Sequence, residues 1–181
     1  RDLHSFPTRR ASALGYPSGG NYWSDYNGTD LHSGSDPFQY VTGSDGIGDT
    51  LYFLDINNID YYPLMGEFSD FNVLLNGIDV QVVSNSAVSD FQFSGLTISF
   101  NVSKVKSWQG FCNVRVPTTL LNGTLKVFVN GTQVPYSLLP GSDSSISYLY
   151  FTYFTFDQPT EQVIIMPEFP EPLILALFAL A

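Results

Sequence analysis

The stretch LKVFVNGTQV at residues 125–134 decides the fold of this chain. Apolar side chains at Leu125, Val127 and Val129 recur with a period of two, which is typical of a half-buried strand. The Asn130-Gly131 pair follows at once and favours a type I′ turn, because both central residues of that turn need a positive φ angle. The stretch therefore predicts an antiparallel β-hairpin.

The same alternation recurs on both sides of this hairpin. It is found in three further groups of apolar residues: Ile78, Val80 and Val82; Leu96, Ile98, Phe100 and Val102; and Cys112, Val114 and Val116. Two more strands are expected at 146–156 and 161–166. About seven strands at this spacing are typical of an immunoglobulin-like antiparallel β-sandwich. We therefore expect an all-β chain with such a sandwich over residues 71–166.

Charge and cysteine content exclude several classes of function. The net charge is −10, and residues 12–103 contain neither Lys nor Arg. Such a surface repels a phosphate backbone, so a nucleic-acid partner is not expected. Cys112 is the only cysteine, which rules out an intrachain disulfide, and its place among alternating valines predicts a buried thiol.

The two ends of the chain differ from the rest. Residues 1–11 hold three of the seven basic residues and resemble a translated sequencing adapter, so we expect a non-native or disordered terminus. Residues 167–172 (PEFPEP) predict a stiff proline spacer. Residues 173–181 (LILALFALA) predict a truncated hydrophobic helix that begins a membrane anchor, since a complete span takes about 20 residues. This order predicts an extracellular protein that is anchored at the cell surface.

Residues 12–70 are rich in Gly, Asn, Asp, Ser and Tyr, which favours turns and short strands. Three motifs lie here in order: GGNYWSDY at 19–26, DGIGDT at 45–50 and NIDYYPLM at 58–65. Together they resemble the segment that closes the right-handed β-helix of the periplasmic copper-binding (NosD-type) family in archaeal cell-surface proteins. The sandwich, the Pro-Glu-Phe-Pro spacer and the apolar tail are similar to the anchored C-terminal part of such proteins. The resemblance implies that residues 12–70 form a β-helix-capping segment and that parallel coils precede Gly15 in the intact protein.

Copper is the metal that this family resemblance implies. It prefers imidazole, thiolate and thioether ligands. The candidates are scattered without a paired spacing, so copper binding is not expected: His32, Met65, Cys112 and Met166.

The DGIGD stretch at 45–49 is the strongest candidate metal site. Its glycines allow a sharp turn that brings the carboxylates of Asp45 and Asp49 together, and Ca²⁺ takes about six to eight oxygen ligands. Asp25, Asp30 or Asp36 would have to complete the set. The alternative is that these aspartates are turn residues that accept hydrogen bonds from their own backbone.

Aromatic residues and asparagines give two further candidate sites. Tyr22, Trp23 and Tyr26 either contact carbohydrate or plug the end of the preceding β-helix, because aromatic faces serve both purposes. Four Asn-x-Ser/Thr patterns are candidate N-glycosylation sites, with Asn-Gly turn chemistry as the alternative. Asn101 is expected on the polar face of its strand and Asn130 in a turn, so both should be exposed. The four asparagines are Asn27, Asn101, Asn122 and Asn130.

No catalytic constellation is predicted. A Ser-His-Asp triad would have to use His32 with residues adjacent in sequence, such as Asp30 and Ser33, and triads are not assembled in that way. The aspartates between residues 25 and 60 lie in polar, turn-like surroundings, where no raised pKa is expected.

The sequence therefore favours a non-enzymatic extracellular surface module that combines a stalk with a β-helix cap. The membrane is the expected partner, through the C-terminal anchor. Cell-surface polysaccharide and surface-layer proteins are further candidate partners. One alternative is a calcium-dependent carbohydrate-binding or adhesive protein. Another is the non-catalytic tail of a β-helix enzyme that acts on polysaccharide.

Overall fold

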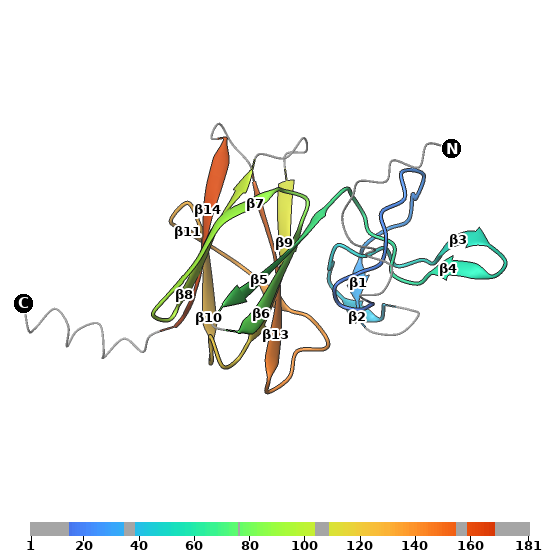
Figure 1. Ribbon diagram of the computed structural model, residues 1–181. Coiled ribbons are helices and arrows are strands. Elements are labelled where there is room, and N and C mark those ends of the chain that lie inside the picture. The colour runs from blue at the N-terminus through green and yellow to red at the C-terminus, as the bar shows by residue number, and fades with distance from the viewer. Residues whose placement is uncertain (1–14, 35–38, 76, 104–108, 155–158, 169–181) are drawn as a thin grey trace, which may run out of the picture.

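The computed structural model describes residues 15–34, 39–75, 77–103, 109–154 and 159–168, and this part of the chain is entirely β-structure and turns (Figure 1). Residues 15–68, here called the N-terminal segment, are mostly irregular. They contain two short hairpins, which pair β1 (His32–Ser33) with β2 (Val41–Thr42) and β3 (Tyr52–Asp55) with β4 (Asn58–Asp60). The remaining strands form two sheets that face one another.

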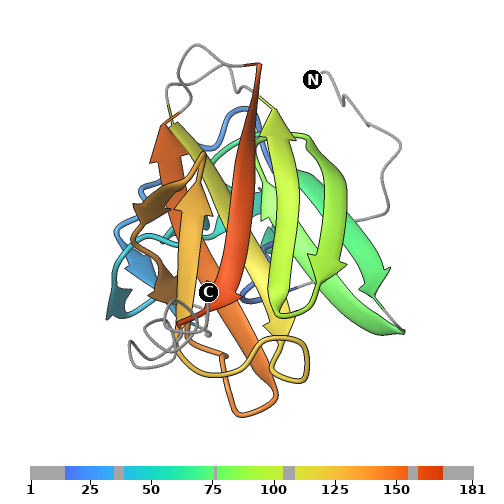
Figure 2. The ribbon, with the colours of Figure 1, turned by 90° about the vertical axis from the view of Figure 1, so that its left-hand side faces the viewer.

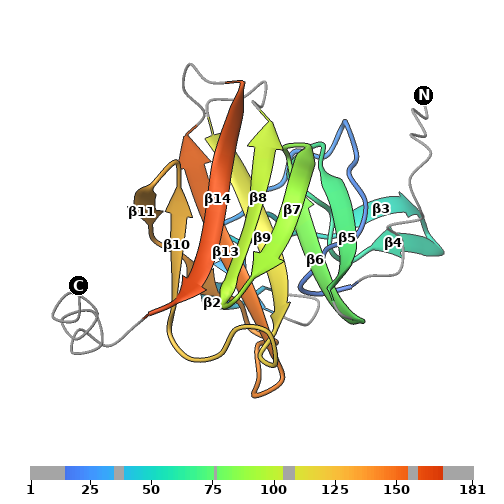
Figure 3. The ribbon, with the colours of Figure 1, turned by 60° about the vertical axis from the view of Figure 1, so that its left-hand side comes forward.

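Each sheet of the sandwich has five antiparallel strands, and Figure 3 shows the first sheet in front of the second. The first sheet has the order β11-β10-β14-β8-β7, from strands β7 (Val88–Ser94), β8 (Thr97–Ser103), β10 (Leu125–Val129), β11 (Thr132–Val134) and β14 (Thr160–Pro167). The second has the order β12-β13-β9-β6-β5, from strands β5 (Ser69–Leu75), β6 (Ile78–Ser84), β9 (Gln109–Pro117), β12 (Ser137–Leu138) and β13 (Ile146–Phe154).

The hairpin predicted from LKVFVNGTQV is present as β10 and β11, in which Val129 pairs with Thr132. Asn130 and Gly131 form the turn with φ angles of 47° and 77°, as a type I′ turn requires. The alternating groups at 78–82, 98–102 and 112–116 lie within β6, β8 and β9. The all-β class and the β-sandwich are thus confirmed.

Three strands were not anticipated, namely β5, β7 and β12. All three lie at the edges of their sheets, where one side of the strand has no neighbour and polar side chains are tolerated. Leu96 was expected on the apolar face of a strand, but it lies in the turn between β7 and β8 and is 51% exposed. The apolar alternation therefore begins at Ile98.

The core lies between the two sheets. Phe100, Phe151 and Cys112 are almost completely buried there, so the prediction of a buried thiol is confirmed. Burial also raises the pKa of Cys112 to about 12, so its thiol stays protonated and unreactive at neutral pH. The aliphatic members of this core alternate along the central strands: Val80, Val82, Ile98, Val102, Val114, Val116, Val127, Leu149, Val163 and Ile165.

The N-terminal segment covers the outer face of the second sheet. In Figure 2 it lies behind that sheet, on the side away from β14. Gln81, Val83 and Asn113 alternate with core residues and point outward, yet none is more than 6% exposed. The Asn113 side chain donates a hydrogen bond of 2.7 Å to the Pro17 carbonyl oxygen, and Ser18 Oγ donates one of 2.9 Å to Gln81 Oε1. β6 and β9 are therefore buried on both faces.

The predicted adapter-like terminus (1–11) and the predicted anchor (173–181) lie outside the described residues, as does most of the proline spacer. Among the residues that the structure describes, no helix is long and apolar enough to cross a membrane.

Candidate functional site

The three motifs of the N-terminal segment pack against one another around Leu64. Leu64 is buried, and its backbone forms a parallel β-bridge with Tyr22 and an antiparallel β-bridge with Ile47. Backbone hydrogen bonds join the same motifs, from Gly20 N to Tyr62 O at 2.7 Å and from Gly48 N to Pro63 O at 2.7 Å. The motifs therefore form a single structural unit.

Two glycines in these motifs make room for side chains from another motif. A Cβ atom at Gly20 would overlap the carboxylate of Asp60, and one at Gly48 would overlap the phenol of Tyr26. Gly46 has a φ angle of +85°, which favours glycine for a different reason. Within DGIGD, packing therefore explains Gly48 and the positive φ angle explains Gly46.

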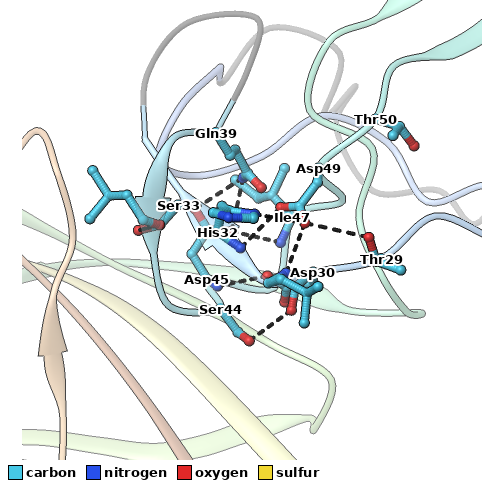
Figure 4. A network of polar contacts seen from close by, with 12 residues as sticks. Thr29, Asp30, His32, Ser33, Gln39, Ser44, Asp45, Ile47, Asp49 and Thr50 are labelled. Atoms are coloured by element: carbon cyan, nitrogen blue, oxygen red, sulfur yellow. Dashed lines mark hydrogen bonds and ion pairs between the residues drawn. The ribbon is translucent and has the colours of Figure 1, made fainter.

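A carboxylate network lies at the centre of this unit (Figure 4). The Asp30 carboxylate accepts backbone N–H groups from Asp45 at 3.1 Å and Gly46 at 2.9 Å. The Asp45 carboxylate accepts the N–H of Ile47 at 3.0 Å and both oxygens accept from Gln39 Nε2, at 3.0 and 3.1 Å. The two aspartates therefore hold the 45–47 turn in shape.

Asp49 organises the second half of the network. Its carboxylate accepts the backbone N–H groups of Leu31 at 2.9 Å and His32 at 3.1 Å. It also lies 3.3 Å from His32 Nδ1 and 3.4 Å from Thr29 Oγ1. Asp49 thus joins the DGIGD motif to the start of β1.

Burial changes the acidity of two of these aspartates. Desolvation, partly offset by backbone hydrogen bonds, raises the pKa of Asp45 to about 8 and that of Asp30 to about 6, and neighbouring carboxylates add to the effect. The expectation that aspartates 25–60 keep ordinary pKa values is therefore wrong for this pair. Asp45 is only 2% exposed because the 45–47 turn faces Phe111 and Tyr150 of the sandwich.

The predicted calcium ligands are only partly brought together. Asp30, Asp45 and Asp49 share the network, but Asp25 lies elsewhere and accepts the Tyr52 hydroxyl at 2.7 Å, and Asp36 lies outside the described residues. Among the described residues, no three or more His, Cys, Asp or Glu side chains are grouped as a metal ion requires. Calcium binding stays a prediction: only Asp45 accepts a hydrogen bond from its own turn, whereas Asp30 and Asp49 accept theirs from backbone N–H groups at least 15 positions away.

The residues considered for copper do not fit a copper site. Cys112 is enclosed in the sandwich core, whereas His32 belongs to β1 and pairs with Asp49. Met65 is exposed in the N-terminal segment, and Met166 lies on β14 in the opposite sheet. Imidazole, thiolate and thioether therefore do not converge.

Of the three predicted aromatic residues, Trp23 and Tyr26 pack against Tyr52, whereas Tyr22 is partly exposed. Trp23 stacks on Tyr52 with ring centroids 4.8 Å apart, and Tyr26 contacts the edge of the same ring. The Tyr26 hydroxyl donates to the Thr50 carbonyl oxygen at 2.7 Å. Tyr22 is partly exposed and bridges Leu64, so the three rings do not form one flat platform.

The four glycosylation asparagines differ in their surroundings. Asn27 and Asn122 are exposed, and neither Nδ2 donates a hydrogen bond within the described residues. Asn101 lies on the polar face of β8, as predicted, and its Nδ2 donates to Asp90 at 2.9 Å. Asn130 Nδ2 donates to the buried carboxylate of Glu161, while its Oδ1 accepts the N–H of Gln162 at 2.8 Å.

Sequence reasoning missed a hollow beside the β3–β4 hairpin. It has a volume of about 550 Å³ and is lined by residues that include Asn21, Trp23, Asn57, Asp60 and Tyr61. These residues belong to the first and third motifs and to the hairpin turn. The only signal in the sequence was the local density of Asn and Tyr.

A second hollow of about 600 Å³ lies where the β1–β2 hairpin meets β12 and the loop after it. It separates the N-terminal segment from the sandwich next to Ser44 and Leu139.

Comparison of the chain with protein-family models, with curated proteins and with solved structures found no match.

Proposed function

We propose that this chain is a non-enzymatic module of a cell-surface protein, in which the sandwich carries the N-terminal segment outward from a membrane anchor. The observation that supports this most is the arrangement of the two parts. The N-terminal segment is bonded to the outer face of the second sheet, through Asn113 and Gln81. β14, which leads towards the proposed anchor, lies in the first sheet on the other side of the core (Figure 1).

Within this proposal, the N-terminal segment caps a right-handed β-helix of the NosD-type family that the motifs resemble. The parallel bridge between Tyr22 and Leu64 supports this, because parallel pairing of successive coils is how a β-helix is built. Its surface also exposes large apolar side chains, which a preceding coil would cover. These are Leu31, Tyr40, Phe53 and Ile56.

The sandwich is proposed to be immunoglobulin-like. Hairpins within a sheet alternate with connections that cross to the other sheet, so that β14 lies between β10 and β8, and β9 lies between β13 and β6. Such a closed core supplies a rigid spacer, because the central strands are held by neighbours on both edges.

The non-enzymatic part of the proposal rests on the burial and the hydrogen-bond partners of the acidic residues. Asp45, whose pKa is the most strongly raised among these aspartates, is enclosed by Gln39 and Ile47 and is not presented to a substrate. His32 does pair with a carboxylate, that of Asp49, but the adjacent Ser33 hydroxyl is buried and directed to the Val41 carbonyl oxygen at 3.4 Å. Ser33 is therefore not aligned with this pair as a nucleophile.

Surface display tests the proposal directly. The complete reading frame would be expressed in an archaeal host with an epitope inserted at the exposed turn Asn122–Gly123, and intact cells would be treated with a non-permeant biotin reagent and with protease. We expect labelling and shaving of the cell-bound protein. A matched variant truncated after Glu168 should instead be released into the medium. Protection of the epitope in intact cells, or retention of the truncated variant, would contradict the proposal.

A further inference from the structure

We propose that the hollow beside the β3–β4 hairpin, lined by Trp23, Tyr61, Asn21 and Asn57, binds an uncharged saccharide. Its volume of about 550 Å³ lies within the range of about 300–1,000 Å³ that is usual for small-molecule sites. This inference is independent of where the protein is located in the cell and of whether a β-helix precedes it.

The wall of the hollow is preorganised by Asp60, which is only 8% exposed. Its carboxylate accepts the Asn21 N–H at 2.8 Å, the Trp23 Nε1–H at 2.8 Å and the Tyr62 N–H at 3.0 Å. Trp23 is held further by stacking on Tyr52. A site whose groups are already fixed loses less conformational freedom when a ligand binds.

The hollow offers both kinds of group that a sugar ring needs. Trp23 and Tyr61 supply aromatic surface for the C–H faces of the ring, and Tyr61 remains 48% exposed. The side-chain amides of Asn21 and Asn57 make no hydrogen bond within the described residues, so their donors and acceptors are free for hydroxyl groups.

Charge selects the class of saccharide. Carboxylates lie on the wall and on the adjoining hairpin, at Asp60 and Asp55, and residues 12–103 supply no Lys or Arg to balance them. An acidic sugar would be repelled at this site. An uncharged ring can use the amides without that cost, which is why we infer a neutral ligand.

The test uses the full chain on an array of neutral oligosaccharides built from glucose, mannose and galactose, with oligogalacturonates as the acidic arm. Neutral ligands that bind are then titrated calorimetrically. We expect Tyr61→Ala to weaken binding by about tenfold, the effect of losing one aromatic contact of about 1.4 kcal/mol. Asn57→Ala should also weaken binding, because it removes a side-chain amide from the hollow. The matched control Tyr40→Ala removes a tyrosine that is 69% exposed outside the hollow, and it should bind as the unchanged protein does.

Tryptophan emission supplies a second readout. Trp108→Phe leaves Trp23 as the only tryptophan, and a bound neutral saccharide should shift its emission. Three results would overturn the inference: no binding of any neutral oligosaccharide at millimolar concentration, equal binding of oligogalacturonates, or equal effects of Tyr61→Ala and Tyr40→Ala. If the Trp108→Phe variant does not fold, saturation-transfer NMR on the unchanged chain replaces it, and absence of transfer to the sugar protons counts against the site.

Discussion

The side-chain amide of Asn113, in the middle of the second sheet, donates a 2.7 Å hydrogen bond to the carbonyl oxygen of Pro17, a residue 96 positions earlier in the chain. Both groups are buried. This bond fastens the N-terminal segment to the sandwich at the point where β9 is covered on both faces.

Asn113→Leu removes the donor and leaves the Pro17 carbonyl oxygen buried without a partner. A buried group left unpaired in this way costs about 1–3 kcal/mol. We expect faster amide hydrogen exchange across residues 15–34 and little change in the core strand β8. Gln133→Ala, which removes an exposed amide from β11, is the control and should leave exchange unchanged. Equal protection in both variants would show that the bond does not hold the segment.

Gly20→Ala tests how the three motifs pack. The added Cβ would overlap the Asp60 carboxylate, which already holds Asn21 and Trp23. Overpacking of this kind costs about 1–3 kcal/mol, so the N-terminal segment should unfold at lower denaturant concentration, as Trp23 fluorescence in a Trp108→Phe background would report. Gly66→Ala is the matched control, because nothing lies within 4 Å of a Cβ at Gly66. Identical unfolding of the two variants would refute the packing explanation.

The N-terminal segment should be more stable at mildly acidic pH than at alkaline pH. The folded pKa of Asp45, about 8, and of Asp30, about 6, lie above the ordinary value of 3.8. The folded state therefore binds protons more tightly than the unfolded state, and the stability present below pH 4 is lost as pH rises towards 6 and 8. The slope is at most about 1.4 kcal/mol per pH unit for each group. Hydrogen exchange of the 39–49 region between pH 5 and 9, corrected for intrinsic rates, measures it.

Asp45→Asn is the variant that isolates this effect. Its amide keeps an oxygen for the Ile47 N–H. Once the Gln39 amide rotates by half a turn, the new Nδ2 can donate to Gln39 Oε1, which is buried without a partner among the described residues. The pH dependence should become shallower above pH 6. Glu67→Gln removes a carboxylate from the exposed surface and should leave the slope unchanged. If stability depends on pH just as steeply in Asp45→Asn, the pH dependence comes from groups other than Asp45.

Glycan occupancy should differ among the four candidate asparagines. Asn27 and Asn122 are exposed and their Nδ2 groups donate no hydrogen bond to any described residue, whereas Asn101 and Asn130 use theirs to hold Asp90 and Glu161. A glycan at Asn130 would have to be accommodated beside the buried Glu161 carboxylate. We expect peptide mass spectrometry of native material to find modification at Asn27 and Asn122 first. Full occupancy at Asn130 with none at Asn122 would contradict the exposure argument.

Calcium should not change the stability of the N-terminal segment. The carboxylates of Asp30, Asp45 and Asp49 already accept hydrogen bonds from backbone N–H groups, which a bound Ca²⁺ would have to displace or share. The thermal unfolding midpoint should be the same in millimolar Ca²⁺ and in EDTA. A rise with Ca²⁺ that disappears in Asp49→Asn would instead establish the calcium interpretation of DGIGD.

The strands that could be predicted are those whose own side chains alternate. In β8, β9 and β10 every second residue faces the core, so the period of two is visible without knowledge of any partner. β7 was missed because a bulge between Ser89 and Gln92 places Val88 and Phe91 three residues apart, which breaks the period of two. β5 was missed because it is an edge strand that begins with polar residues. The hollow beside the β3–β4 hairpin was missed because its walls come from residues as far apart in the chain as Gly15 and Tyr62.

Local sequence by itself determined the central strands, the Asn130-Gly131 turn and the buried position of Cys112, because each depends on neighbours a few residues away. Only the tertiary structure decided that Asn113 meets Pro17, that Asp49 pairs with His32 and that Asp45 is buried with a raised pKa. The first and third of these features arise when the N-terminal segment covers the second sheet, and the second arises when that segment folds on itself. Burial removes water from groups that would be solvated in an isolated turn, and no local pattern records that loss.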